Sequence, residues 1–488
     1  MKKYFSLIFV IVYCCNGVSQ NTSLKYPLTL ERCLAVLHQR NPDLIIANQY
    51  IDLAVNNLEI FESSNGSQHA VNIRLFDNYG FTQDRHNSVT DIYYNYSRQL
   101  SSGISINLRS SVRTGNMMAD NLSGTPIYPN YMINATYYLN SNELPLNRRL
   151  FQSRIVNTEN TQNMVLLQKN YEVIFNYISL YFHLEKLEKL KYILKLTNKI
   201  YSISKERFER DVIDLESLLN SQINLNEIRL RIIQTESIIS RNLSELSILS
   251  SVFITDLYRE YQQNSCTFGF LKKKFEGLRP HEFNIDFNLA SLSSHPEIQQ
   301  INIQKKINEI NIELIEKRYS PQLSFNLNLS GNGILNSNSR EIFAFDNFNH
   351  NIGFYVNYSI PIFDTGLKRN RVEEYYIWNN LNENKYIKIK NLKTENIKRH
   401  FQNLEEIKIQ VEVYDSLIHI EDIRLGILTE EFERNEIDLD YFLRKQQSYV
   451  QKIDRFIDLI MDYFFSVNNL YYDSGDERIL KDILFRYF

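Results

Sequence analysis

Charged side chains recur in one pattern at two places in this chain, and they are its best candidates for recognition chemistry. Residues 208–222 read FERDVIDLESLLNSQ and residues 432–446 read FERNEIDLDYFLRKQ, with eight of fifteen positions identical at a constant offset of 224. Arginine and carboxylate groups in such segments can bind a partner protein through complementary charge. The candidates lie near the start of each copy: Arg210, Asp211 and Val212 in the first, and Arg434, Asn435 and Glu436 in the second.

Catalytic chemistry is not indicated by the sequence. The nine histidines are scattered, none is spaced with cysteine or acidic residues as metal ligands are, and no phosphate-binding loop or nucleophile elbow occurs. Lone histidines on helices, such as His183 and His400, are more often packing or surface residues. We therefore expect a protein that is not an enzyme and that holds no cofactor or metal ion.

Long amphipathic helices must position the two repeated segments, because an apolar heptad leads into each of them. A strict period of seven favours coiled packing with a left-handed twist. The heptad residues are Leu166, Val173, Leu180, Leu187, Leu194, Tyr201 and Phe208 in the first series, and Ile397, Leu404, Val411, Ile418, Leu425 and Phe432 in the second.

The heptad stops after each phenylalanine and then resumes. Asp211 or Asn435 stands at the break, and both residue types tolerate turn geometry. Each copy is therefore predicted to be an outgoing helix, a tight turn and a returning helix, and the chain is predicted to be a tandem duplication.

Each half of the chain also opens with the same predicted elements. A helix, capped by Thr29 in the first half, is followed by a proline-containing break at Asn41-Pro42 or His295-Pro296. A second helix then runs to about residue 62 or 318.

The N-terminus and the composition favour an exported protein. A basic start, an apolar run and small residues before Gln20 fit a signal peptide over residues 1–19, and lipid attachment at Cys14 or Cys15 is the alternative. The net charge of −3 gives no reason to expect nucleic acid as a partner. No later stretch is long and apolar enough to be predicted as a membrane helix.

Segments with a two-residue period precede each long helix. In the second half, residues 321–331 and 351–363 alternate apolar and polar side chains over about the length of a transmembrane strand. Amphipathic strands after an export signal favour a β-barrel, and too few of them occur for one chain to close a barrel alone. The alternation does not show which runs of the first half cross a membrane; these runs lie near 71–75, 92–96, 104–108 and 131–139.

Together these features resemble the TolC-type outer-membrane efflux protein family. No single motif is diagnostic, but their order, spacing and duplication are specific, and the resemblance extends over residues 24–475. The motifs are L-x-L-E-x-x-L from Leu28 followed by Asn41-Pro42, Ser102-Gly103 in a first-half strand, Ile360-Pro-Ile-Phe-Asp-Thr-Gly366, and the segment ending Leu443-x-x-Gln446.

The resemblance implies an α+β membrane protein that assembles as a homotrimer. Each protomer would give four strands to one twelve-stranded outer-membrane β-barrel and four helical segments to a long periplasmic coiled-coil tunnel. The chain would lie in the bacterial outer membrane, in contact with its lipid and with a large periplasmic portion. It would conduct substrates passively as the exit duct of a tripartite efflux or type I secretion system. A periplasmic adaptor protein, meeting the two turns, and an inner-membrane pump would be its partners.

One departure from the family concerns the periplasmic entrance, which a ring of aspartates narrows in the best-known members. Aligned on the repeated segment, those positions fall on Tyr441 and Arg444, while Asp438 and Asp440 lie close by. These four residues are the candidates for a periplasmic gate. The alternative is that the two acids are solvated side chains of a helix.

Two other functions remain open at this stage: a periplasmic adaptor with helical hairpins, and a structural coiled-coil protein of the envelope. The sequence does not identify a transported substrate. The predicted division is a signal peptide (1–19), a first repeat (24–265, with a β region about 69–145 and a hairpin about 146–255), a linker (266–281), a second repeat (282–475, with a hairpin about 364–472) and a tail (476–488).

Overall fold

The computed structural model of the chain divides into two compact units. The predicted signal peptide and linker lie outside the described residues. The sheet unit comprises the described parts of residues 47–162 and 297–389, and the hairpin unit comprises those of 1–46, 163–296 and 390–488. The structure describes residues 29–80, 85–100, 102–115, 127–139, 143–251, 289–333, 348–360 and 365–484.

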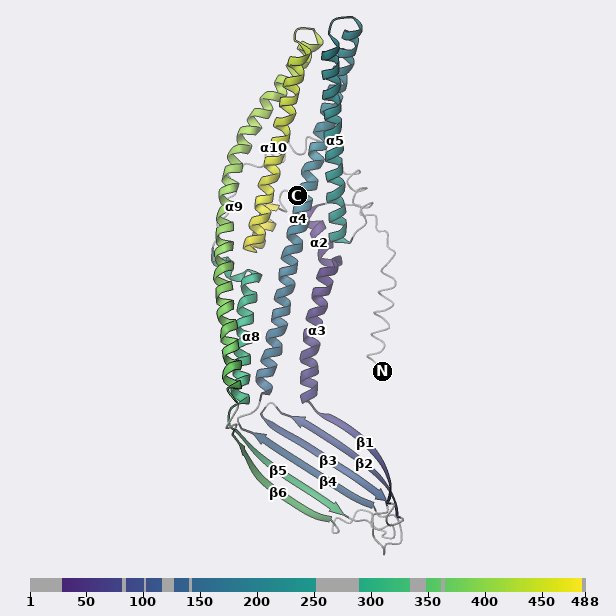
Figure 1. The fold of residues 1–488 in the computed structure, drawn as a ribbon, viewed down its shortest axis with the longest axis vertical. Helices are drawn as coiled ribbons and strands as arrows, with labels where there is room; N and C mark the ends of the chain where they lie inside the picture. Colours follow the sequence, from purple (N-terminus) through teal and green to yellow (C-terminus); the bar gives the residue numbers. More distant parts are fainter. Residues whose placement is uncertain are drawn as a thin grey trace. The chain divides into compact units, whose positions relative to one another are not determined.

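Six antiparallel strands form one sheet in the sheet unit, and they follow one another in chain order (Figure 1). Four strands come from the first half of the chain and two from the second, with β4 pairing with β5. Their bounds are Gln68–Gly80 (β1), Arg85–Gln99 (β2), Ile104–Gly115 (β3), Ile127–Tyr138 (β4), Gln322–Gly333 (β5) and Phe348–Ser359 (β6).

The described sheet thus has six strands, two more than the four per chain that the resemblance implies for the barrel. All four alternating runs of the first half are strands, and each continues beyond the residues that revealed it. Backbone hydrogen bonds extend a ladder through segments of mixed polarity, so side-chain alternation marks where a strand is and not how many strands pair.

One face of the sheet, called here the apolar face, is apolar across all six strands. Residues directly opposite in neighbouring antiparallel strands point to the same face, and the registers set Ile73 opposite Ile92 and Leu327 opposite Phe354. Exposed members of the apolar face are Val71, Ile73, Leu75, Ile92, Val112, Leu327, Ile352, Phe354 and Val356.

Two pairs of long helices have matching lengths. In each pair an outgoing helix of 66 or 67 residues is followed by a returning helix of 36 residues. The near-equal lengths are what a duplication leads us to expect. These helices are α4 (Leu144–Glu209), α5 (Leu215–Ser250), α9 (Leu367–Glu433) and α10 (Leu439–Ser474).

The predicted heptads of α4 and α9 form the core of the hairpin unit. Val173, Leu180, Ile397 and Phe432 are all buried, and full burial of a side chain of this size contributes about 1.5–3 kcal/mol. One cluster joins all four helices; its members are Leu190, Ile193, Ile200, Ile228, Leu425, Leu428, Phe432, Leu439, Phe442, Leu443, Tyr449, Val450 and Ile453.

Three of the shorter helices start at the predicted cap or breaks. Thr29 Oγ1 accepts a hydrogen bond from Arg32 N at 3.3 Å, and Asn41 Oδ1 accepts one from Asp43 N at 3.0 Å. Proline suits the first turn of a helix because it lacks only an amide that has no helical partner there. These three helices are α2 (Leu30–Arg40), α3 (Pro42–Asn65) and α8 (Pro296–Arg318); η2 (Leu289–Ser294) and η4 (Ile479–Leu484) are two further short elements.

No helix in the described part of the chain combines the length and the apolar character needed to cross a membrane.

Candidate functional site

Both repeated segments form the same turn between helices of the hairpin unit. Asp211 follows α4 with a φ of 56°, and Asn435 follows α9 with a φ of 68°, both in the left-handed region. In the first turn the Val212 amide donates to the carbonyl of Arg207 at 2.9 Å, and the equivalent bond closes the second turn at the same length. This is the hydrogen bond that caps a helix C-terminus. The turns predicted at these two residues are confirmed.

Replacing Asn435 with valine should destabilise the second turn by about 1–3 kcal/mol, because a β-branched residue is strained at this φ. Asn435→Gly should be neutral or slightly stabilising, since glycine adopts left-handed geometry freely. The measurement is the rate of limited proteolysis at the turn. Asp211→Val should reproduce the effect in the first turn, and equal cleavage of the valine and glycine variants would contradict the prediction.

The two turns lie next to each other because side chains at the ends of α4 and α9 are in contact. The Arg207 guanidinium lies 4.2 Å from the centroid of the Phe432 ring and donates to the carbonyl of that residue. Lys199 forms an ion pair with Glu433. All six predicted contact residues are exposed around these turns; they are Arg210, Asp211, Val212, Arg434, Asn435 and Glu436.

The candidate gate residues lie at the start of α10 in different surroundings. Asp440 is half-buried and accepts from Asn220 of α5 at 3.4 Å. The Tyr441 hydroxyl accepts from Arg424 of α9 at 3.4 Å. The remaining two are exposed: Asp438, which is the N-cap of α10, and Arg444. The structure therefore sets Asp440 beside α5 and Tyr441 beside α9.

A buried layer of amide side chains lies behind the turns. Gln446 Nε2 donates to Thr197 Oγ1 at 3.0 Å, and Gln446 Oε1 accepts from Asn224 Nδ2 at 2.8 Å. All three residues are buried, so the layer links α4, α5 and α10. Polar groups that are satisfied only in one pairing favour one helix register. The sequence identified Gln446 only as part of the repeat, and its partners were missed.

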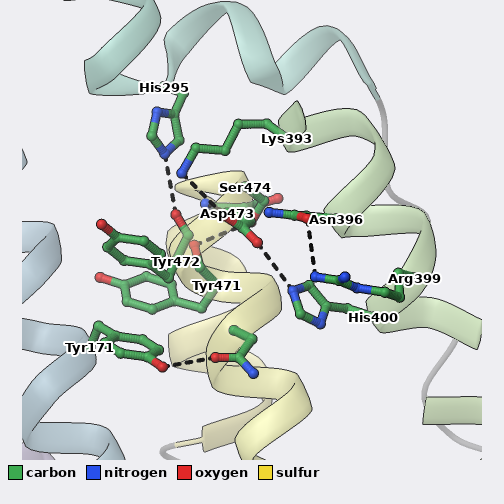
Figure 2. A network of polar contacts seen from close by, with 12 residues as sticks. Tyr171, His295, Lys393, Asn396, Arg399, His400, Tyr471, Tyr472, Asp473 and Ser474 are labelled. Atoms are coloured by element: carbon green, nitrogen blue, oxygen red, sulfur yellow. Dashed lines mark hydrogen bonds and ion pairs between the residues drawn. The ribbon is translucent and has the colours of Figure 1, made fainter. Parts of the chain in front are cut away.

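A second buried network joins α9 to the end of α10 (Figure 2). Asp473 lies between two basic side chains of α9: its Oδ1 is 3.1 Å from Lys393 Nζ, and its Oδ2 is 3.1 Å from His400 Nε2. Lys393 also lies 4.7 Å from the ring centroid of Tyr472, whose carbonyl accepts from His295 Nε2 at 3.2 Å. The side chains of Lys393 and Asp473 are 5% and 11% exposed.

His400, expected to be a packing or surface residue, packs in the interior with its side chain 12% exposed and contacts Asp473, a partner that the sequence did not indicate. His400 and Lys393 are seven residues apart on one helix, so they share a face. That spacing was the only sequence signal available, because Asp473 is 73 residues from His400. The network holds the returning helix of the second repeat to its outgoing helix through a buried charge.

The pKa of Asp473 reflects this setting. Burial raises it, but the hydrogen bond from His400 and the charge of Lys393 outweigh burial and hold the pKa below its ordinary value. A carboxyl with a lowered pKa contributes stability that is present above its unfolded pKa and is lost as the pH falls through its folded pKa. The ionised carboxylate of Asp473 therefore contributes stability to the hairpin unit at neutral pH that is lost in acid.

Glu185 of α4 shows the opposite shift. Burial raises its pKa to about 7, with Glu188 adding repulsion and Lys189 opposing it. Its contribution is fully present below the unfolded pKa of 4.5 and is lost as the pH rises through about 7. Glu185→Gln should therefore gain about 3 kcal/mol over the parent protein at pH 8 and nothing at pH 4. Urea unfolding at both pH values checks this, with exposed Glu236→Gln as the control that should change stability at neither.

Among the described residues, no group of three or more His, Cys, Asp or Glu side chains is arranged to hold a metal ion. The two turns expose charged side chains together with Val212.

Comparison with known proteins identifies solved structures of the same fold, but no family profile or curated sequence that matches. Solved structures do match: the CmeC outer membrane channel of Campylobacter jejuni has a TM-score of 0.67 at 16% identity, over 96% of this chain and 93% of that one. The outer membrane protein VceC of Vibrio cholerae gives 0.65 at 11%, over 92% and 99%. The open-state MtrE outer membrane channel of Neisseria gonorrhoeae gives 0.63 at 10%, over 91% and 88%.

Proposed function

Because the chain has the fold of the TolC-type outer-membrane channels, we propose that it is the outer-membrane exit duct of a tripartite efflux or type I secretion system. It would conduct substrates passively from the periplasm to the exterior. The observation that carries this proposal is the exposed apolar face of the six-stranded sheet, in a chain whose other unit consists of paired long helices.

Lipid is the occupant that suits the apolar face. Ile73, Leu75, Ile352 and Phe354 are 67–77% exposed in the single chain. A contiguous exposed apolar surface of this kind is rare on soluble monomers and marks a contact with a membrane or a protein, and strands with one apolar and one polar side are typical of outer-membrane barrels. We therefore place the sheet unit in the outer membrane and the hairpin unit in the periplasm.

Two unpartnered helix seams in the hairpin unit support assembly with further copies. Each seam repeats apolar residues at spacings of mostly three or four, which is the pattern of coiled-coil packing. In the single chain both seams are exposed; they are Leu215, Leu219, Ile223, Leu230 and Ile233 along α5, preceded by Val212 of the turn, and Ile409, Val413, Ile420, Ile423 and Ile427 along α9.

A two-fold dimer in which one seam packs against the same seam of a second copy would leave the other seam exposed. They fit a ring in which α5 of one copy packs against α9 of the next, because such head-to-tail contacts close into rings. The proposed ring is a homotrimer, as the family resemblance implies. The duplicated hairpins would then line one tunnel.

The turns are the proposed contact with a periplasmic adaptor, through which an inner-membrane pump would act. Arg210 and Arg434 are exposed at the two turns, and a helical-hairpin partner could pack beside them. The four residues at the start of α10 remain proposed gate residues: Asp438, Asp440, Tyr441 and Arg444.

The test combines fractionation with charge reversal. We expect the protein in the outer-membrane fraction, migrating in SDS as a trimer that heating dissociates. Arg210→Glu with Arg434→Glu should abolish crosslinking to the adaptor and efflux while the trimer persists. Arg371→Glu, an exposed arginine of α9 in the sheet unit, is the matched control. A soluble monomer would overturn the proposal, and unchanged crosslinking of the double variant would remove the turns from it.

A further inference from the structure

The β1–β2 hairpin belongs to the same wall as the other four strands. β1 pairs with β2 over thirteen residue pairs, from Gln68–Ser97 to Gly80–Arg85, and β2 pairs with β3 over eleven. A hairpin folded away from the sheet would not share such a ladder. Each of the six strands is therefore joined to its neighbour by a ladder of backbone hydrogen bonds.

Side chains of neighbouring strands also lie next to each other on both faces of the sheet. On the apolar face Ile73 of β1, Ile92 of β2 and Val112 of β3 are cross-strand neighbours. On the opposite face Asp91 of β2 forms an ion pair of 3.2 Å with Arg113 of β3. The apolar series of β3–β6 thus continues through residues 92–96 of β2 to residues 71–75 of β1.

The two edges of the sheet match each other. β1 has 13 residues and β6 has 12, and the strand order ends at these two, so each leaves one side of its backbone unpaired in the described sheet. An unpaired edge is not tolerated in lipid. Because six is even, β6 of one copy runs antiparallel to β1 of the next, as every pair within the sheet does.

We propose that β6 of each copy pairs with β1 of the next, so that all six strands of each copy enter the membrane wall. A ring of three copies then has eighteen strands, where the fold's resemblance implies twelve. This inference rests on the proposed function, and it deepens that function by setting the width of the opening.

The difference in width is large. With strands about 4.8 Å apart and tilted by about 40°, twelve strands give a backbone diameter of about 24 Å and eighteen give about 36 Å. The cross-section more than doubles. Barrels of 16–18 strands leave an aqueous channel, so the backbone wall alone would enclose a wider opening than twelve strands allow.

A single tryptophan reports which strands face lipid. The chain has one native tryptophan, Trp378, which is replaced by phenylalanine to give the background. Ile73→Trp in β1 and Phe354→Trp in β6 both lie on the apolar face, and Asn72→Trp and Tyr355→Trp are their matched controls on the opposite face. The purified protein is reconstituted in vesicles of brominated phosphatidylcholine, which quenches tryptophan in contact with the acyl chains.

We expect strong quenching at both apolar-face positions and weak quenching at both controls. Quenching of Phe354→Trp without quenching of Ile73→Trp would overturn the proposal, because β1 would then lie outside the wall, while the proposed function would stand. Absence of quenching at both positions would overturn the proposed function itself.

Cysteine pairs test the edge contact. In a cysteine-free background, a β1 cysteine (Ile73→Cys) is combined with one of three β6 cysteines in separate variants (Ile352→Cys, Phe354→Cys or Val356→Cys). The control series replaces Ile73→Cys with Leu108→Cys in β3. Facing side chains of paired strands lie about 4.5–5.5 Å apart at Cβ, so oxidation should give dimer and trimer bands only in the β1 series. Crosslinking in the β3 series alone would overturn the eighteen-strand wall.

Discussion

Replacing Asp473 with asparagine is expected to lower the free energy of unfolding by about 3–5 kcal/mol, the cost of leaving a buried charge without its counter-charge. Lys393 Nζ and His400 Nε2 each lie 3.1 Å from this carboxylate. Asparagine keeps the size and one acceptor, but it removes the negative charge that the buried ammonium of Lys393 requires. The measurement is urea unfolding of the full-length protein in detergent at pH 7, followed by the helical circular dichroism signal.

Two further variants test whether the loss comes from the ion pair between Lys393 and Asp473. Lys393→Met combined with Asp473→Asn should recover part of the loss, because the double variant no longer buries an unpaired charge. Glu477→Gln, which breaks an ion pair whose side chains are 71% and 64% exposed, should change stability by less than about 1 kcal/mol. A double variant that is less stable than the sum of the single ones would contradict the charge argument.

Truncating Phe432 to alanine should cost about 3–5 kcal/mol, which is typical of a fully buried aromatic side chain. Its ring is 0% exposed, stacks on Phe442 at a centroid distance of 5.4 Å and lies under Arg207. The loss should therefore loosen α9, α10 and α4 together at the turns. Hydrogen exchange of the residues around both turns is the direct measurement.

The duplication supplies the control for this variant. Phe208 occupies the equivalent position of the first copy but is only partly buried. Phe208→Ala should therefore cost clearly less than Phe432→Ala, although the sequence treats the two positions alike. Equal losses would show that burial in the single chain does not describe the assembled protein.

The helical part of the fold could be predicted from the sequence because its signals are local and repeated. The heptads through Val173 and Ile397 have the period of a buried helix seam, and Asp211 and Asn435 interrupt them with residue types that adopt left-handed geometry. Each of these signals lies within a few residues of the feature that it predicts.

The rest depends on pairings that no local pattern encodes. The alternation in residues 71–75 and 92–96 indicates strands, but membership of one sheet is decided by backbone partners far along the chain. The Asp473 network has the same character, since Lys393 is 80 residues away. The gate residues were carried over from a family pattern from which this chain departs, and their role remains a proposal.

The chain enters the sheet from α3 and leaves it into α4. Of the four strands between these helices, β1 begins and β4 ends at the same rim of the sheet (Figure 1). A single added strand would deliver the chain to the far rim, about a strand's length from the start of its next helix. Such a sheet can therefore be enlarged only by whole hairpins, because each inserted hairpin brings the chain back to the rim from which it left. Natural variants of this architecture should accordingly differ by pairs of strands and never by one.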